Sequence, residues 1–146
     1  MQSDRKARLM NIEMNKAIVR GYIELWSTGN LALADEVLAE DFVDHMRPSQ
    51  APGPESVKQE VKAFREGFPD ARIIIEQIIA EGDTVAFRFM LQGTHRGMFA
   101  GYPPTGKEVV LIGVDFIRIA AGKIVELWSI QDTLRWAEQL GLKRSR

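Results

Sequence analysis

The sequence contains no cysteine. Disulfide frameworks, thiolate chemistry and cysteine-based zinc sites are therefore excluded. A chain without disulfides fits a reducing compartment, and the first ten residues lack the apolar segment of a signal peptide, so we expect a cytoplasmic location. No apolar run comes near the ~20 residues that span a bilayer, so no membrane partner is expected.

An excess of charge of one sign is also missing, because 19 Lys and Arg balance 20 Asp and Glu to a net charge of -1. A nucleic acid or an anionic membrane usually requires a basic excess in its partner, and we expect neither here. The sequence has no G-x-S-x-G, Walker A or G-x-G-x-x-G motif. It therefore predicts no nucleophilic serine, no bound nucleotide and no cofactor.

What is present suits one domain, 1–146, because the 146 residues are 45% hydrophobic and can form a single core. Residues 1–10 look like a weakly ordered lead-in. From there, apolar residues at spacings of three and four predict helices over about 11–28, 31–38 and 54–68. A short extended segment ends at His45, before a loop rich in proline.

Nearly everything after Asp70 predicts β structure, with strands over about 71–79, 84–94, 107–119 and 123–132 and a closing helix over 133–140. The dipeptide Ala121-Gly122 occupies the position of a two-residue hairpin turn. Helices followed by hairpin-linked strands indicate an α+β fold. We expect the N-terminal helices to pack on a curved antiparallel sheet and to enclose a pocket with it.

The hairpin turn also predicts which side chains face each other. Counting outward from it places Asp115 opposite Trp128 and Leu111 opposite Asp132, all on one face of the sheet. Carboxylates among large apolar groups are poorly solvated, which raises their pKa toward the range useful for acid–base catalysis. Asp115 and Asp132 are thus candidate catalytic groups. For either one alone, a solvent-facing or backbone-capping role is the alternative.

Only two histidines exist, His45 and His95. We take His45 as a third candidate proton carrier, at the rim of the pocket, because histidine titrates near neutral pH. His95, at the end of a strand, is a candidate substrate contact, with a structural hydrogen bond as the alternative. A metal site built from His45, His95 and Asp44 is a further alternative, but no zinc-type spacing supports it and we expect no metal.

Large aromatic residues are candidates for shaping a pocket that takes a small apolar or aromatic ligand. Trp128 and Phe42 accompany the candidate acids, and Trp26 is large enough to reach a cavity from its helix. Phe99 lies on a glycine-rich connection, 96–106, that resembles a flap. For each of these residues, packing in the core or on the surface is the alternative.

The opposite face of the long predicted strand, which carries Val110, Ile112, Val114 and Phe116, is equally apolar. Periodicity therefore does not decide which face borders the pocket. A second copy of the chain covering the other face would bury both, so we expect a homodimer.

Four segments of the sequence resemble the SnoaL-like polyketide cyclase family, within the superfamily named for nuclear transport factor 2. They are Tyr22-x-x-x-Trp26-x-x-Gly29-Asn30, Asp41-Phe42-Val43-Asp44-His45, Gly93-x-His95-x-Gly97-x-Phe99-x-Gly101-x-Pro103-Pro104-Thr105-Gly106-Lys107, and Asp115-Phe116-x-Arg118-Ile119-x-x-Gly122-Lys123-Ile124-Val125-Glu126-x-Trp128-x-x-x-Asp132. The resemblance covers about 14–141. It implies a cone-shaped α+β barrel.

Members of known function close the last ring of an aromatic polyketide ester by an intramolecular aldol reaction, without metal or cofactor. The resemblance implies that an acidic side chain removes a proton next to the ester, while an acid protonates the carbonyl oxygen. This chain departs from the pattern, because the catalytic Asp of characterised members falls at about Ser129. A serine is no base at neutral pH, which leaves Asp132 and Asp115 as the nearby acids.

Two functions follow. The first is a small cofactor-independent enzyme that performs acid–base chemistry, by aldol cyclisation or isomerisation, on an apolar carbonyl or polyketide-like substrate. The second is a non-catalytic module for small-molecule binding or dimerisation, because one scaffold serves many functions.

Overall fold

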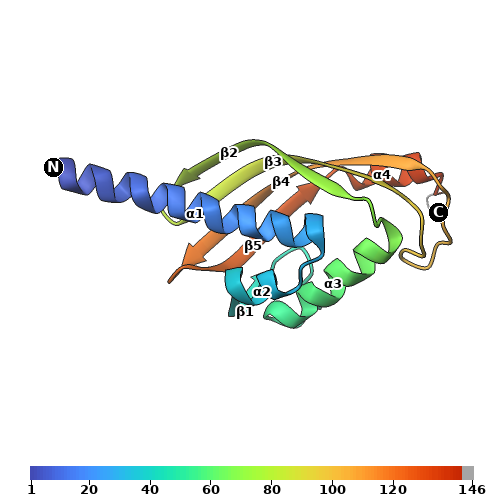
Figure 1. Cartoon of the computed structure of the whole chain (residues 1–146), viewed down its shortest axis with the longest axis horizontal. Coiled ribbons are helices and arrows are strands. Elements are labelled where there is room, and N and C mark those ends of the chain that lie inside the picture. Colours follow the sequence, from blue (N-terminus) through green and yellow to red (C-terminus); the bar gives the residue numbers. More distant parts are fainter. Residues whose placement is uncertain (143–146) are drawn as a thin grey trace.

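The computed structural model describes residues 1–142. Helices lie on one side of a five-stranded curved sheet, which confirms the α+β class (Figure 1). No helix in this described part is long and apolar enough to cross a membrane.

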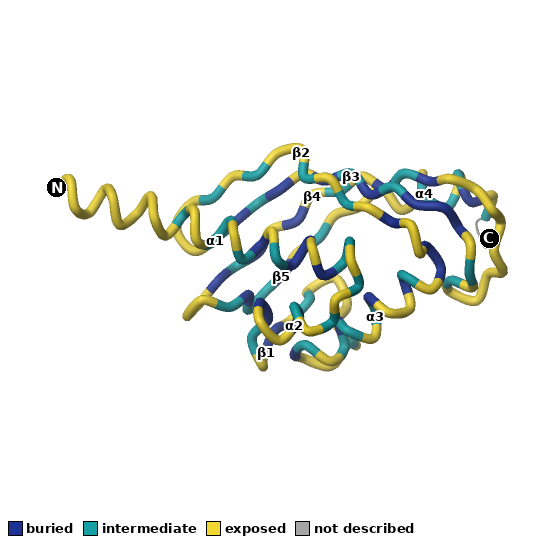
Figure 2. Tube along the Cα trace, viewed as in Figure 1, coloured by how far each residue is buried: buried dark blue, intermediate teal, exposed yellow. Residues whose placement is uncertain are grey.

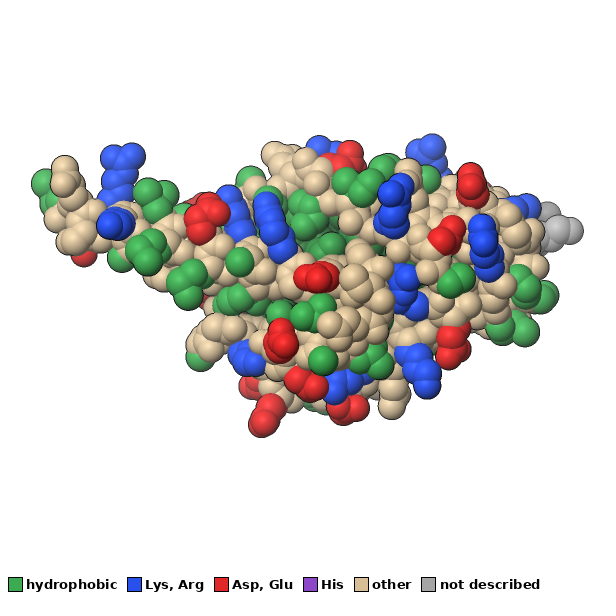
Figure 3. Space-filling model, viewed as in Figure 1, with side chains coloured by type: hydrophobic (Ala, Val, Ile, Leu, Met, Phe, Trp, Pro, Cys, Tyr) green, Lys and Arg blue, Asp and Glu red, His purple; other side chains and the backbone are tan. Residues whose placement is uncertain are grey.

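The first helix, α1, runs over Gln2–Thr28 and ends at Gly29, whose φ of 73° is the left-handed conformation that glycine adopts without strain. Residues 2–10 continue this helix, where the sequence had predicted a weakly ordered lead-in. They consist mostly of good helix formers, without glycine or proline, but offer no apolar stripe to bury. They are exposed, and this N-terminal arm projects beyond the rest of the molecule (Figures 1 and 3).

Helix α2 (Ala32–Val37), strand β1 (Leu38–Asp44) and helix α3 (Pro54–Gly67) follow, close to their predicted positions. Pro54 opens α3, where its missing N–H is not needed. The apolar stripe of α3 is buried, including Val57, Val61 and Phe64. The helices α1, α2 and α3 lie on one face of the sheet (Figure 1).

The remaining strands are β2 (Arg72–Glu81), β3 (Thr84–Thr94), β4 (Glu108–Ala120) and β5 (Lys123–Gln131). Neighbouring strands follow the order β1-β5-β4-β3-β2. The last four are antiparallel as predicted, but β1 pairs with β5 in parallel. The sheet is therefore mixed, because a partner this distant in sequence joins the edge without a hairpin turn that would fix it antiparallel.

Side chains along β3, β4 and β5 alternate between two different environments. Buried and more exposed residues alternate along these strands (Figure 2). The inner face carries the core residues and meets the helices, whereas the outer face carries half-exposed apolar and charged side chains. On the inner face, the space where Gly113 would carry a side chain is filled by the Phe89 ring, 2.7 Å from the ideal Cβ position. Because Gly113 has no side chain, the Phe89 ring can pack directly against the backbone of β4 at this position.

The turn at Ala121 and Gly122 has φ values of 50° and 75°, as a two-residue hairpin requires. Ile119 pairs with Ile124 as predicted, but Arg118 then pairs with Glu126, so β5 carries one extra residue, Val125. This β-bulge shifts every later pair by one position. Asp115 consequently faces Ser129, and Phe116 faces Trp128.

The register predicted from the sequence was therefore wrong beyond the bulge. Asp115 and Trp128 were expected on one face, yet they lie on opposite faces, because a shift of one residue exchanges the two faces of a strand.

Helix α4 (Thr133–Leu140) continues from β5 and replaces it beside the first part of β4. The Gln139 side chain donates to the Val110 carbonyl and accepts from the Val110 N–H, both at 2.8 Å. The Gln139 amide thus takes up the hydrogen-bonding groups of Val110 on the part of β4 that β5 does not reach. Helix α4 closes one end of the inner face.

Candidate functional site

A cavity of about 570 Å³ lies between the inner face of the sheet and the helices. Residues from α1, α3, α4, all five strands, the segment after β1 and the connection between β3 and β4 line it. Most of the wall is apolar, and its aromatic members come from three helices, the β3–β4 connection and the sheet: Tyr22, Trp26, Phe64, Phe89, Phe99 and Trp136. A cavity of this size and composition suits a small, mostly apolar ligand.

Asp115 is the buried charge of the cavity, with 6% of its surface exposed. Its Oδ1 atom is buried and has no hydrogen-bond partner among the described residues. Burial raises the pKa of Asp115 from its ordinary 3.8 to about 6. The Ser129 hydroxyl lowers this pKa and the charge of Asp44 raises it further. Asp115 is thus poised to exchange a proton near neutral pH.

Tyr22 is the second polar group deep in the cavity. It is buried, and this burial together with the negative charge of Asp115 raises the pKa of its phenol well above the usual range. The phenol therefore stays protonated and can donate a hydrogen bond, although it cannot act as a base. A proton acceptor and a hydrogen-bond donor thus share one apolar space.

Two more carboxylates line the cavity together with one guanidinium. Arg47 forms an ion pair with Glu60 of α3 and lies 3.7 Å, Nε to Oδ2, from Asp44 of β1. The Arg47 side chain is half exposed, whereas both carboxylates are more buried. Burial raises the pKa of Glu60, and Arg47 partly counters that rise. The guanidinium therefore neutralises only part of the carboxylate charge around it.

Three of the candidate residues line this cavity: Asp115, Trp26 and Phe99. Phe99 reaches it from the connection between β3 and β4, where Gly97 packs so tightly that a Cβ would lie 2.0 Å from the Glu66 carbonyl oxygen. The Arg96 and Gly97 N–H groups both donate to the Gly67 carbonyl. The predicted flap is thus held against the end of α3 by backbone contacts.

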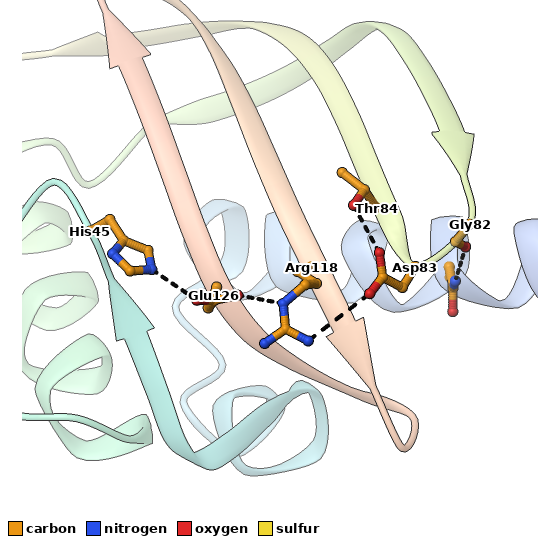
Figure 4. A network of polar contacts seen from close by, with 7 residues as sticks. His45, Gly82, Asp83, Thr84, Arg118 and Glu126 are labelled. Carbon is orange, nitrogen blue, oxygen red and sulfur yellow. Dashed lines mark hydrogen bonds and ion pairs between the residues drawn. The ribbon is translucent and has the colours of Figure 1, made fainter.

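His45 and Trp128 lie on the outer face, away from the cavity lining. Their rings stack with centroids 4.5 Å apart. The His45 Nε2 atom is 3.2 Å from a Glu126 carboxylate oxygen, and the other oxygen of Glu126 accepts from Arg118, which reaches Asp83 at 4.0 Å (Figure 4). The bulge explains this placement of Trp128, and strand alternation explains that of His45, because Asp44 before it points inward.

Asp132 also lies outside the cavity lining. Its carboxylate accepts a hydrogen bond from the Arg135 N–H at 3.1 Å and caps the first turn of α4. This is the backbone-capping alternative that the sequence had left open. Phe42 is 2% exposed and belongs to the core rather than to the cavity wall.

His95 is buried but does not line the cavity either. Its Nδ1 atom accepts from the Thr105 N–H at 3.3 Å and contacts the Thr105 hydroxyl at 3.1 Å, which fixes the base of the connection between β3 and β4. His45, His95 and Asp44 thus occupy three separate environments. Within residues 1–142, no group of three or more such side chains is arranged to hold a metal ion.

Besides Tyr22, sequence reasoning missed three charged residues as members of the cavity wall. Asp44 could have been found by alternation, since Phe42 two positions earlier is a core residue of the same strand. Glu60 sits three residues after Val57 and four before Phe64, on the apolar stripe of α3. Arg47 gave no signal, because it lies in an irregular loop whose path only tertiary contacts define.

The fold and the cavity define a class of small α+β proteins that enclose an apolar ligand site between helices and a curved sheet. The family model described as SnoaL-like polyketide cyclase matches residues 16–140. The chain therefore belongs to the SnoaL-like polyketide cyclase family. This confirms the resemblance that the sequence motifs indicated.

Solved structures agree with this assignment. IdmH from Streptomyces antibioticus, a proposed polyketide cyclase, is 30% identical with a TM-score of 0.74, over 88% of this chain and 99% of IdmH. A proposed polyketide cyclase from Bacillus cereus is 27% identical with a TM-score of 0.77, over 90% of this chain and 83% of that one. Together with the family model, these relatives support a cyclase- or isomerase-type role in general.

TsrD from Streptomyces laurentii shares the fold at 19% identity, with a TM-score of 0.84 over 90% of this chain and 97% of TsrD. Comparison with curated proteins finds no matching sequence.

Proposed function

We propose that the chain is a cofactor-independent enzyme that performs acid–base chemistry on an apolar carbonyl compound of the polyketide type, by aldol cyclisation or isomerisation. Asp115 is the proton carrier. The observation that carries this proposal is a buried carboxylate that lines an aromatic cavity and has one oxygen without a hydrogen-bond partner. Such a group has a pKa close to the working pH and a free lone pair for a proton.

In this mechanism, Asp115 removes a proton from the carbon next to the substrate carbonyl. The C–H bonding pair moves into the carbonyl system as an enolate, and the proton stays on the carboxyl group. The Tyr22 phenol donates a hydrogen bond to the developing oxyanion. In a cyclisation, the enolate carbon then attacks a second carbonyl of the same substrate, and Asp115 gives its proton to the alkoxide that forms. In an isomerisation, Asp115 returns the proton to a different atom of the enolate.

The hairpin register supports Asp115 in this role. The resemblance to characterised cyclases implies a catalytic Asp at about Ser129, which lies on β5. Ser129 pairs directly with Asp115 of β4, and both line the cavity. A carboxylate on the neighbouring strand therefore reaches the same region, and Ser129 becomes its hydrogen-bonding partner.

The remaining candidates have no such position. His45 and Trp128 lie on the outer face, and Asp132 caps α4. Trp26 and Phe99 are proposed to contact the substrate, because both line the cavity.

Proton exchange provides the most direct test. Cyclic aromatic ketones would be incubated with the protein in D₂O, and loss of the protons next to the carbonyl would be followed by NMR. We expect exchange by the wild-type protein that rises with pH around 6 and is lost in Asp115→Asn. Glu126→Gln removes a carboxylate from the outer face and should exchange normally.

Exchange that persists in Asp115→Asn would contradict the assignment of the base. If no exchange occurs but native mass spectrometry finds a small molecule retained by the purified protein, the binding-module alternative is favoured over catalysis.

We also propose that the chain pairs with a second copy through the outer face. Ile112, Val114, Phe116 and Trp128 are 38–51% exposed there and form an outer apolar patch. Beside this patch, Arg88 and Glu76 form an ion pair within the chain, with Nη1 and Oε2 3.2 Å apart, so two copies related by a two-fold axis can bring their apolar patches together without an unpaired charge from these two side chains.

Native mass spectrometry tests this proposal. We expect a dimer that Phe116→Glu converts to a monomer, while Met14→Glu, a matched change on exposed α1, leaves it intact. A monomeric wild-type protein would contradict the proposal. The cytoplasmic location stays a prediction, and fractionation of expressing cells checks it.

A further inference from the structure

The charges that line the cavity do not balance. Asp44, Glu60 and Asp115 contribute three carboxylates, and among the described lining residues Arg47 is the single cation. Arg47 is already engaged with Asp44 and Glu60. With all three carboxylates ionised, the cavity therefore carries an uncompensated negative charge.

The excess charge is located where a ligand would meet it. The Arg47 side chain is 48% exposed, against 14% for Asp44 and 23% for Glu60, so the guanidinium lies nearer to solvent than the carboxylates. Asp115 has no cation beside it, and its buried Oδ1 has no donor. The cavity that Asp115 lines is mostly apolar, which leaves the charge of its carboxylate weakly screened.

The walls also favour a cation. Trp26, Trp136 and four other aromatic rings line the cavity. A positively charged nitrogen is stabilised over such rings, and more strongly where water is excluded. A carboxylate ligand would face repulsion from three acidic side chains and would find only a guanidinium that is already paired.

We infer that the cavity selects ligands that combine an apolar or aromatic ring system with a protonated amine, and that the ammonium N–H donates to the Asp115 carboxylate. This inference rests on the proposed use of the cavity as the substrate site and names the substrate class more closely. A charge-assisted hydrogen bond of this kind would offset the charge of the buried carboxylate, which has no cation beside it. A nearby ammonium would also stabilise an enolate formed in the same site.

Three probes that share one ring system and differ only in charge test the inference. They are naphthylmethylamine, naphthalenemethanol and naphthoate, substituted at the same ring carbon, with binding measured by isothermal titration calorimetry at pH 8. We expect the amine to bind at least about tenfold more tightly than the alcohol, and the alcohol more tightly than the carboxylate.

Variants assign this preference to the cavity carboxylates. Asp115→Asn should reduce the advantage of the amine over the alcohol by about tenfold, and Asp44→Asn by a smaller factor, because Arg47 already offsets Asp44. Glu24→Gln removes an exposed carboxylate from the same helix as Tyr22 and should leave the preference unchanged. Circular dichroism confirms that each variant is folded.

Binding of naphthoate as tight as that of the amine would overturn the inference, as would an amine preference that survives both Asp115→Asn and Asp44→Asn, or no binding of any probe. These outcomes leave the proton-exchange test unaffected, because that test uses neutral ketones and measures turnover. Exchange without cation preference would thus retain the proposed function and reject this inference.

Discussion

Each face of the sheet carries a carboxylate, and the two carboxylates differ in burial and in hydrogen-bond partners. On the inner face, Asp115 is buried, lacks a cation and keeps one oxygen without a donor. On the outer face, Glu126 lies in a half-exposed network where Arg118 and His45 use both of its oxygens. The pKa of Asp115 is raised by its burial, whereas hydrogen bonds from Arg118 and His45 lower the pKa of Glu126.

The difference shows that the reactivity of a carboxylate is set by solvent and partners rather than by its place in the sequence. Asp115 and Glu126 lie on adjacent antiparallel strands of one hairpin. Because side chains alternate across the sheet, Asp115 lines the cavity, whereas Glu126 forms ion pairs on the outer face.

The largest expected effect follows from removing each carboxylate in turn. Asp115→Asn should lower the rate of proton exchange by about a hundredfold to ten-thousandfold, the usual contribution of a general acid–base group. Glu126→Gln should change that rate by less than about threefold, because it acts on the outer face. NMR measures the exchange rates of both variants. An equal loss of rate in the two variants would contradict the proposal that only the inner-face carboxylate takes part in proton exchange.

Stability should respond in the opposite direction at the same site. The folded protein keeps the Asp115 proton up to about pH 6, while the unfolded chain loses it near pH 3.8, so stability falls as pH rises through this window. Asp115→Asn removes this loss and should raise the free energy of unfolding by about 1–3 kcal/mol at pH 8. The gain should vanish below pH 4.

Urea unfolding of both proteins at pH 4 and pH 8 measures this effect. A variant that is less stable than the wild type at both pH values would show that the carboxylate is structurally required.

Asp132 provides a smaller effect that separates a cap from a catalyst. Asp132→Ala removes the hydrogen bond to the Arg135 N–H and should lower the free energy of unfolding by about 1 kcal/mol, while Asp132→Asn preserves the cap. Neither change should alter proton exchange. Thermal unfolding and exchange rates test both statements, and an exchange defect in Asp132→Asn would return Asp132 to the active site.

The smallest effect is expected on the outer network. Glu126→Gln removes half-exposed ion pairs that solvent screens, so its thermal midpoint should fall less than that of Asp132→Ala. Adding salt should reduce the difference from the wild type further. A large destabilisation that salt does not reduce would mean that the network holds β1 to β5.

Much of the fold could be predicted from the sequence because its signals are local. Alternating apolar residues placed β3 at 84–94, turn chemistry placed the hairpin at Ala121-Gly122, and apolar spacing placed α3 and α4. The start of α1 was missed, because residues 2–10 show no apolar periodicity although they are helical.

The site was predictable only in part. Asp115, Trp26 and Phe99 were expected at the cavity and line it, but Trp128 was assigned to the wrong face, and His45, expected at the rim of the pocket, stacks on Trp128 instead. One unpaired residue, Val125, accounts for the error at Trp128. No turn or composition signal marks a bulge of this kind, because it depends on how two strands fit together.

By itself, the sequence determined the family, the order of the elements and the presence of carboxylates among apolar groups, since these depend on composition and short-range spacing. Only the tertiary structure decided which carboxylate is desolvated. Burial depends on helices and strands that come together from distant parts of the chain. A shift of one residue in strand register moves a side chain from the cavity to the solvent-facing side of the sheet.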